Sequence, residues 1–71
     1  MPKANQYEYG QLQKRGPDFF FYYGQEQDKH QNHIHHVLNL LARSNWEPCL
    51  YYEELEGTER LPTWIMRRLE D

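Results

Sequence analysis

The stretch of residues 28–52 constrains the fold most, because a helical pattern in it is followed within a few residues by a strand pattern. At about 100° per residue, one side of the expected helix is apolar. The residues on this side are His30, Ile34, Val37, Leu38 and Leu41. Asp28 is the predicted N-cap, and Gln31 occupies the position of its capping-box partner. Pro48 forbids the helix to continue, so we expect one amphipathic helix that Ser44 or Asn45 ends.

Strand patterns lie on both sides of this helix. Gln6–Leu12 and Glu47–Leu55 alternate between two kinds of side chain, and Phe19–Tyr23 is a short, continuous aromatic run. Leu61–Leu69 fits either a strand or a helix with Pro62 in its first turn. The strand is favoured, because it would complete a sheet.

The aromatic run FFFYY cannot bury all of its side chains, because successive side chains of a strand point to opposite faces. The set expected to face the helix is Phe19, Phe21 and Tyr23. Phe20 and Tyr22 then face outward, where we expect them to be exposed or covered by a partner. In the preceding strand, a glycine at position 10 indicates a bulge or a close approach of another backbone.

The order strand–strand–helix–strand–strand predicts a single α+β domain over residues 1–71. In this domain one amphipathic helix packs on a small antiparallel sheet of three to four strands. A chain of 71 residues has room for one small core, and its six Tyr, three Phe and two Trp can fill it. Residues 1–5 are expected to be flexible.

The net charge of −3 comes from an acidic middle segment. This segment argues against a broad phosphate-binding surface and is compatible with a basic protein partner. Cys49 is the only cysteine, which excludes an intrachain disulfide and a cysteine-based zinc site within one chain. The apolar runs are too short to span a membrane, and the first residues have no apolar signal region. We therefore expect a cytoplasmic protein.

Several short motifs are distributed along the chain. They are Tyr7-Glu8-Tyr9, Leu38-Asn39-Leu40-Leu41 followed by Asn45-Trp46-Glu47, and Arg67-Arg68. Together they resemble a family of small bacterial α+β domains of unknown function, in which a helix ends in Gly-Trp-Glu and the closing strand carries Lys/Arg-Arg. Asn45 stands where the family has Gly, and Asn enters the left-handed region more easily than most residues. The resemblance implies the fold and no activity. We expect a bacterial or phage source.

Four histidines within seven residues make a metal site the first candidate for chemistry. His30, His33 and His36 are spaced at i, i+3, and none of the four has a partner at i+4. On a helical wheel the rings point in different directions, with His35 well away from the others. We therefore expect a polar helix flank, with a site at His30, His33 and His36 as the less favoured alternative.

Nothing in the sequence arranges groups for catalysis. Cys49 directly after Pro48 is typical of a small buried residue, and Ser44 has no base placed beside it. The glycines are isolated and form no phosphate-binding loop. We expect a protein that is not an enzyme and needs no cofactor.

The surplus of large aromatics favours a protein-interaction module, an adaptor or an inhibitor that docks an acidic, aromatic surface on a larger protein with a basic surface. The residues expected to form this surface are Tyr51, Tyr52, Glu53, Glu54, Glu56, Phe20 and Tyr22. An edge strand could also pair two copies of the chain. The alternative function is nucleic-acid binding, in which outward strand aromatics stack on bases. These aromatics are Tyr7, Tyr9, Phe20 and Tyr22. The phosphate contacts would come from Lys14, Arg15, Arg67 and Arg68.

Overall fold

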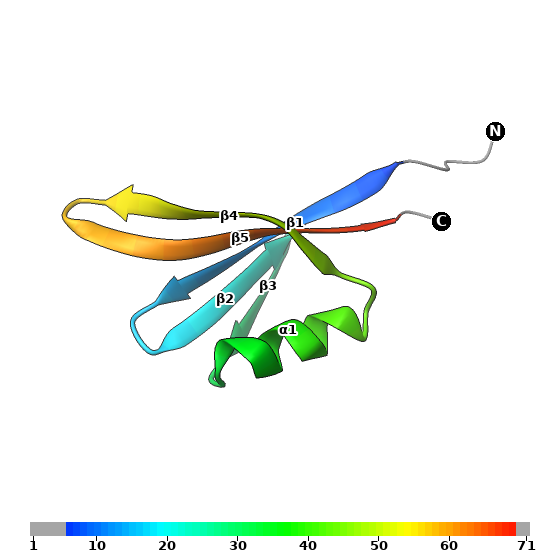
Figure 1. Ribbon diagram of the computed structural model, residues 1–71, viewed down its shortest axis with the longest axis horizontal. Helices are drawn as coiled ribbons and strands as arrows, with labels where there is room; N and C mark the ends of the chain where they lie inside the picture. The colour runs from blue at the N-terminus through cyan, green and yellow to red at the C-terminus, as the bar shows by residue number, and fades with distance from the viewer. Residues whose placement is uncertain (1–5, 70–71) are drawn as a thin grey trace.

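A computed structural model describes residues 6–69 of the chain (Figure 1). Its elements are β1 (Tyr7–Arg15), β2 (Asp18–Tyr23), β3 (Glu26–His30), α1 (Ile34–Ala42), β4 (Glu47–Glu56) and β5 (Glu59–Leu69). Residues 1–5, for which the sequence predicts flexibility, lie outside the described residues. None of residues 6–69 belongs to a helix that is long and apolar enough to cross a lipid bilayer.

The strands form one antiparallel sheet in the order β3-β2-β1-β5-β4. The α+β class is confirmed, but the expected three to four strands become five, because β3 was missed. β3 is polar throughout, so no alternation of apolar residues marks it in the sequence. It forms because Gly24, with a φ of 56°, closes a two-residue hairpin loop after β2.

The predicted start of the helix was also wrong, because the residues expected to begin it belong to β3. Asp28, the expected N-cap, pairs with Phe21 as part of β3, and His30 ends that strand instead of lying on the helix. α1 begins at Ile34 after His33, which caps it without a side-chain hydrogen bond. Strand pairing with β2 has therefore overridden the local capping signal.

The helix ends close to the predicted Ser44 or Asn45: its last residue is Ala42, and residues 43–45 form a turn. Asn45 has a φ of 70°, the left-handed conformation that often ends a helix. The Trp46 N–H then donates a 3.1 Å hydrogen bond to the Leu41 carbonyl. This closure turns Trp46 into the core, where its ring meets Phe21 edge-on with centroids 5.0 Å apart.

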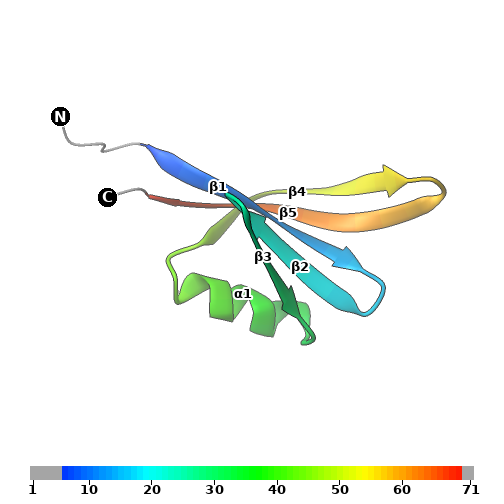
Figure 2. The same ribbon diagram turned by 180° about the vertical axis from the view of Figure 1, so that it is seen from behind.

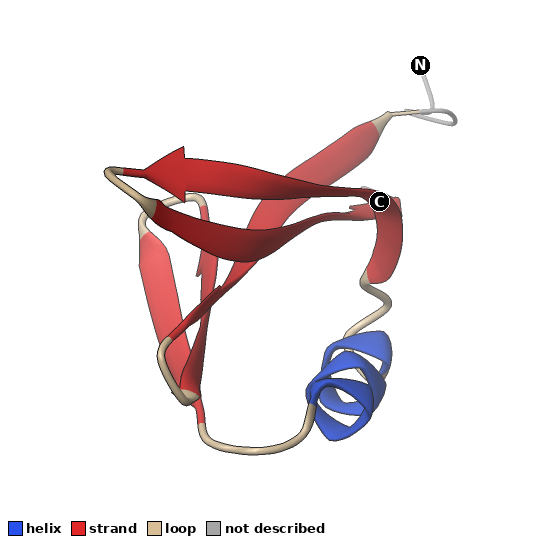
Figure 3. Cartoon of the chain, turned by 60° about the vertical axis from the view of Figure 1, so that its left-hand side comes forward, coloured by secondary structure: helices blue, strands red, loops and turns tan. Residues whose placement is uncertain are grey.

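The core lies between α1 and the one face of the sheet that α1 covers (Figure 3). Its buried members are Leu12, Phe19, Phe21, Val37, Leu41, Trp46 and Met66. The predicted alternation of the aromatic run is confirmed, because Phe19 and Phe21 are buried while Phe20 and Tyr22 are half-buried on the opposite face. Gly10 keeps the regular register, and a Cβ at this position would lie 2.8 Å from Cζ of Phe21. The expected close approach is therefore made chiefly by a ring.

The last segment is a strand, as favoured, and it pairs with both β1 and β4. Pro62 has no N–H to offer to β1, and the β1–β5 pairing ends at Thr63. The remainder of β5 pairs with β4 alone, so the tip of this hairpin reaches beyond the helix (Figure 2).

Candidate protein-interaction surface

The face of the sheet turned away from α1 has no second layer over it in the described part of the chain (Figures 2 and 3). We call it the open face. Pairing sets its side chains in rows, of which two cross all five strands: Gln27–Tyr22–Gln11–Ile65–Leu50 and Lys29–Phe20–Gln13–Thr63–Tyr52. Seven large apolar or aromatic residues are exposed among the described residues, and four are on this face: Tyr9, Leu50, Tyr52 and Leu69. The open face is therefore the main apolar surface of the domain.

A polar network holds the β4–β5 hairpin against β1 beneath these side chains. The amide of Gln13, which is only 1% exposed, donates to Glu54 Oε2 at 2.6 Å and to Thr63 Oγ1 at 3.0 Å. The Gln13 carbonyl oxygen accepts a hydrogen bond from Arg15 Nε at 2.9 Å. Both polar atoms of the Gln13 side chain are thus hydrogen-bonded. These bonds compensate the loss of hydration when the side chain is buried.

Arginines neutralise most of the carboxylates on β4. Arg15 forms a bidentate pair with Glu56 at 3.1 and 2.8 Å, and the hydrogen bond raises the pKa of Arg15 and lowers that of Glu56. Arg67 donates to Glu47 at 2.9 Å, a contact that raises the pKa of Arg67. Among the described residues, Glu54 is the β4 carboxylate without a cation within ion-pair distance.

The residues predicted to form the docking surface are divided between the two faces of the sheet. Tyr52, Glu54 and Glu56 share the open face with Phe20 and Tyr22, whose rings stack with centroids 6.5 Å apart.

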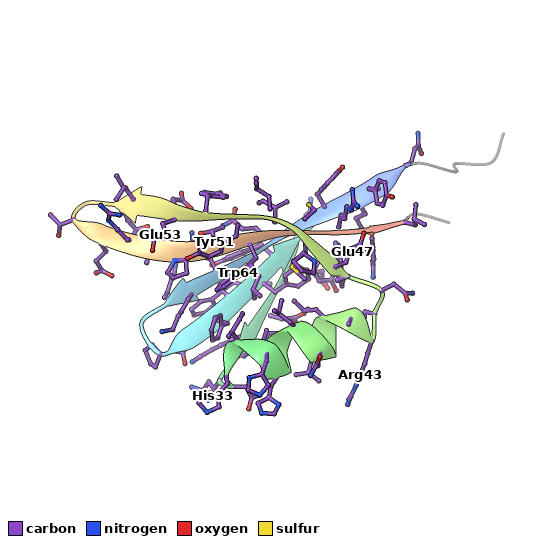
Figure 4. All side chains as sticks on the ribbon, in the orientation of Figure 1. His33, Arg43, Glu47, Tyr51, Glu53 and Trp64 are labelled. Atoms are coloured by element: carbon purple, nitrogen blue, oxygen red, sulfur yellow. The ribbon has the colours of Figure 1, made fainter. Side chains whose placement is uncertain are left out.

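The remaining two predicted residues, Tyr51 and Glu53, lie on the side of the helix. There the Tyr51 ring is 5.1 Å from that of Trp64 (Figure 4). Glu53 pairs with Arg60 at 3.4 Å. The acidic character expected from the sequence is therefore largely cancelled within the chain.

The cations of the nucleic-acid alternative do not converge. Lys14 and Arg15 are neighbours in β1 and point to opposite faces, as do Arg67 and Arg68 in β5. Arg68 donates to Glu8 at 2.8 Å, and its guanidinium lies 4.5 Å from the centre of the Trp46 ring. Three of the four cations thus have a carboxylate partner within the chain.

The histidines are arranged differently from the prediction. His30 ends β3, while His33 directly precedes α1 (Figure 4). The rings of His35 and His36 lie near that of His33, at the start of the helix. His35, expected to lie well away, has its ring 4.1 Å from that of His36 and 6.0 Å from that of His33. No group of three or more ligating residues among residues 6–69 has the geometry to hold a metal ion.

Two further features escaped the sequence. Cys49, expected to be buried, is exposed like every other residue of the edge strand β4, and it lies at the bulge between Pro48 and Leu50. A groove of about 690 Å³ separates the start of α1 from Trp64, with Lys14, Phe19 and His33 also in its lining. The lining residues come from segments that are distant in the sequence, so no sequence motif predicts this groove.

The open-face residues Leu50 and Leu69, and the buried Gln13, were also missed as parts of the surface. Only the full strand order, with β5 between β1 and β4, brings them together. Comparison of the chain with protein-family models, with curated proteins and with solved structures found no match.

Proposed function

We propose that the protein is a small interaction module that docks a larger protein on its open face. The observation that carries this proposal is the uncovered sheet face with Tyr9, Leu50, Tyr52 and Leu69 exposed by 38–58%. A sheet normally buries its apolar face against another layer. Apolar side chains gathered on an uncovered face are typical of a binding surface.

The chemistry of the face favours a partner with an arginine or lysine flanked by apolar side chains. Tyrosines bind well at the centre of interfaces, because they bury a large area and keep a hydroxyl for hydrogen bonding. Glu54 offers the carboxylate that lacks a cation among the described residues, and Tyr52 lies two positions away on the same face. A basic side chain at this point would compensate that charge.

The test is affinity capture from an extract of the native cells with three forms of the full chain. These are the wild type, the double variant Tyr9→Ser/Tyr52→Ser, and Leu40→Ser, a control that removes an exposed apolar residue from the helix. We expect one protein to be retained by the wild type and the control and lost by the double variant, and the purified partner to bind in the same order. Equal retention by all three forms would contradict the proposal.

Single-stranded nucleic acid is the competing ligand, because exposed tyrosines on a sheet can also stack on bases. A labelled single-stranded oligonucleotide is therefore titrated into the same three forms at low salt. Binding that is lost in Tyr9→Ser/Tyr52→Ser would replace the protein partner by a nucleic acid. If none of the three forms binds the oligonucleotide, nucleic acid is excluded as the ligand of the open face, and the capture experiment tests the protein partner.

A further inference from the structure

β4 is an edge strand whose proline, bulge and four glutamates leave an apolar stretch, residues 50–52, exposed between them. All ten of its residues are exposed, and they include Leu50, Tyr51, Tyr52 and Leu55. The opposite edge, β3, is half as long and has no large apolar side chain, and its Glu26, Asp28 and Lys29 are charged side chains of the kind that discourage pairing with another chain. β4 has its proline and its bulge near one end, so residues 50–56 stay regular and available.

We infer that a second copy of this chain pairs antiparallel with β4, across a twofold axis centred on Tyr52. An axis perpendicular to the sheet relates the two copies, so residues opposite each other must come from the same face. This condition restricts the register to pairings in which one β4 residue lies opposite its own counterpart.

These registers differ in which charged residues of β4 lie opposite each other, and this difference favours one of them. Centred on Tyr52, the pairing sets Tyr51 opposite Glu53 and Leu50 opposite Glu54 of the second copy, and no glutamate faces a glutamate. A centre at Glu53 or at Glu54 would place that carboxylate opposite itself, which is destabilising. A centre at Tyr51 would leave only residues 50–52 to pair, because the bulge lies directly before Leu50.

Charge repulsion is low in the Tyr52-centred register. The apolar half of β4 precedes its acidic half, so antiparallel pairing moves the two acidic halves to opposite ends. Glu56 and Glu53 also have cations within the chain, Arg15 at 2.8 Å and Arg60 at 3.4 Å.

The pairing would join two sheets into one of ten strands with both open faces on the same side. The inference does not depend on the proposed function, because it uses the edge of β4 and not the open face. It would nevertheless give a partner with repeated sites two surfaces to bind at once.

Sedimentation equilibrium of the full chain over a range of concentrations tests the pairing. We expect the wild type to approach twice the 8.8 kDa chain mass as concentration rises. Tyr51→Glu, which faces Glu53 of the second copy and lies off the open face, should weaken association at least tenfold. The matched edge substitution Gln27→Glu in β3 should associate as the wild type does. A wild type that stays monomeric, or a Tyr51→Glu form that dimerises equally well, would overturn the inference.

Disulfide trapping tests the register without relying on a destabilising charge. In a Cys49→Ser background, Tyr52→Cys places two thiols opposite each other, within reach of a disulfide between copies. We expect mild oxidation to link this form and to leave Tyr51→Cys and Gln27→Cys in the same background largely unlinked. Equal linking of all three forms, or preferential linking through Tyr51→Cys, would overturn the Tyr52-centred pairing.

Discussion

Gln13 and Glu54, 41 residues apart in the chain, are joined by a 2.6 Å hydrogen bond that ties β4 to β1 across the intervening strand β5. The same amide also bonds Thr63, so one buried side chain connects the three strands that carry most of the open face. A buried group with every bond made fixes a single arrangement, because a shifted register would leave it unpaired. We infer that this contact fixes the position of the β4–β5 hairpin relative to β1.

Replacing Gln13 by Ala should lower the free energy of unfolding by about 1–3 kcal/mol, because Arg15 loses an acceptor and Thr63 and Glu54 lose a donor. Chemical denaturation measures this change. Gln11→Ala, at a half-buried position on the same face, is the control, and its effect should stay within about 0.5 kcal/mol. Equal effects of the two substitutions would show that the network does not stabilise the hairpin.

Asn45 should tolerate Gly and resist Ala, because its φ is 70°. Side chains with a Cβ are strained in this region, and glycine is not. Thermal unfolding of Asn45→Gly should match the wild type, while Asn45→Ala should lose about 1–2 kcal/mol. An Ala variant as stable as the Gly variant would mean that the helix ends without the left-handed residue.

Gly10→Ala should destabilise the fold by about 1–3 kcal/mol, because the new methyl group would overlap the Phe21 ring. A double-mutant cycle with Phe21→Leu separates this contact from other effects. The cost of Gly10→Ala should be smaller in the Phe21→Leu background than in the wild type. An unchanged cost would point instead to the Tyr22 carbonyl oxygen, which would lie 3.0 Å from the new Cβ, as the obstacle.

The Arg15–Glu56 pair should make stability depend on acid pH. The pKa of Glu56 is lowered in the folded state, chiefly by the hydrogen bond from Arg15. Its contribution is therefore complete above the unfolded pKa of a glutamate, about 4.3, and is lost as pH falls through the lowered folded pKa. The difference in denaturation midpoint between wild type and Glu56→Gln should shrink below about pH 4. Glu59→Gln is the control, and a difference that persists at about pH 2, well below the ordinary glutamate pKa, would contradict this assignment.

The local features of the fold were predictable from the sequence, and the strand that depends on tertiary pairing was not. The left-handed turn at Asn45 after the helix follows from φ preferences, and the two-sided aromatic run follows from the alternation of a strand. β3 has no apolar pattern, and its Asp28 resembles a helix cap. The start of the helix and the positions of the histidines were wrong in consequence.

The candidate surface was predictable where neighbouring residues of one strand form it, and not where strand pairing brings residues of distant segments together. Tyr52 and Glu54 were identified from their own neighbourhood, and they do lie on the open face. Tyr9 and Leu69 belong beside them only because β5 lies between β1 and β4. The arginines that neutralise Glu47 and Glu56 come from other strands, so counting charges along the chain overestimated the acidity of β4.

The most direct test of docking on the open face is a pair of amide NMR spectra of the isotopically labelled chain, free and bound to the partner recovered by capture. We expect the largest shifts at Tyr9, Gln11, Leu50 and Tyr52, with small shifts in α1. Shifts concentrated at α1 or in the groove beside Trp64, with the open face unchanged, would contradict it.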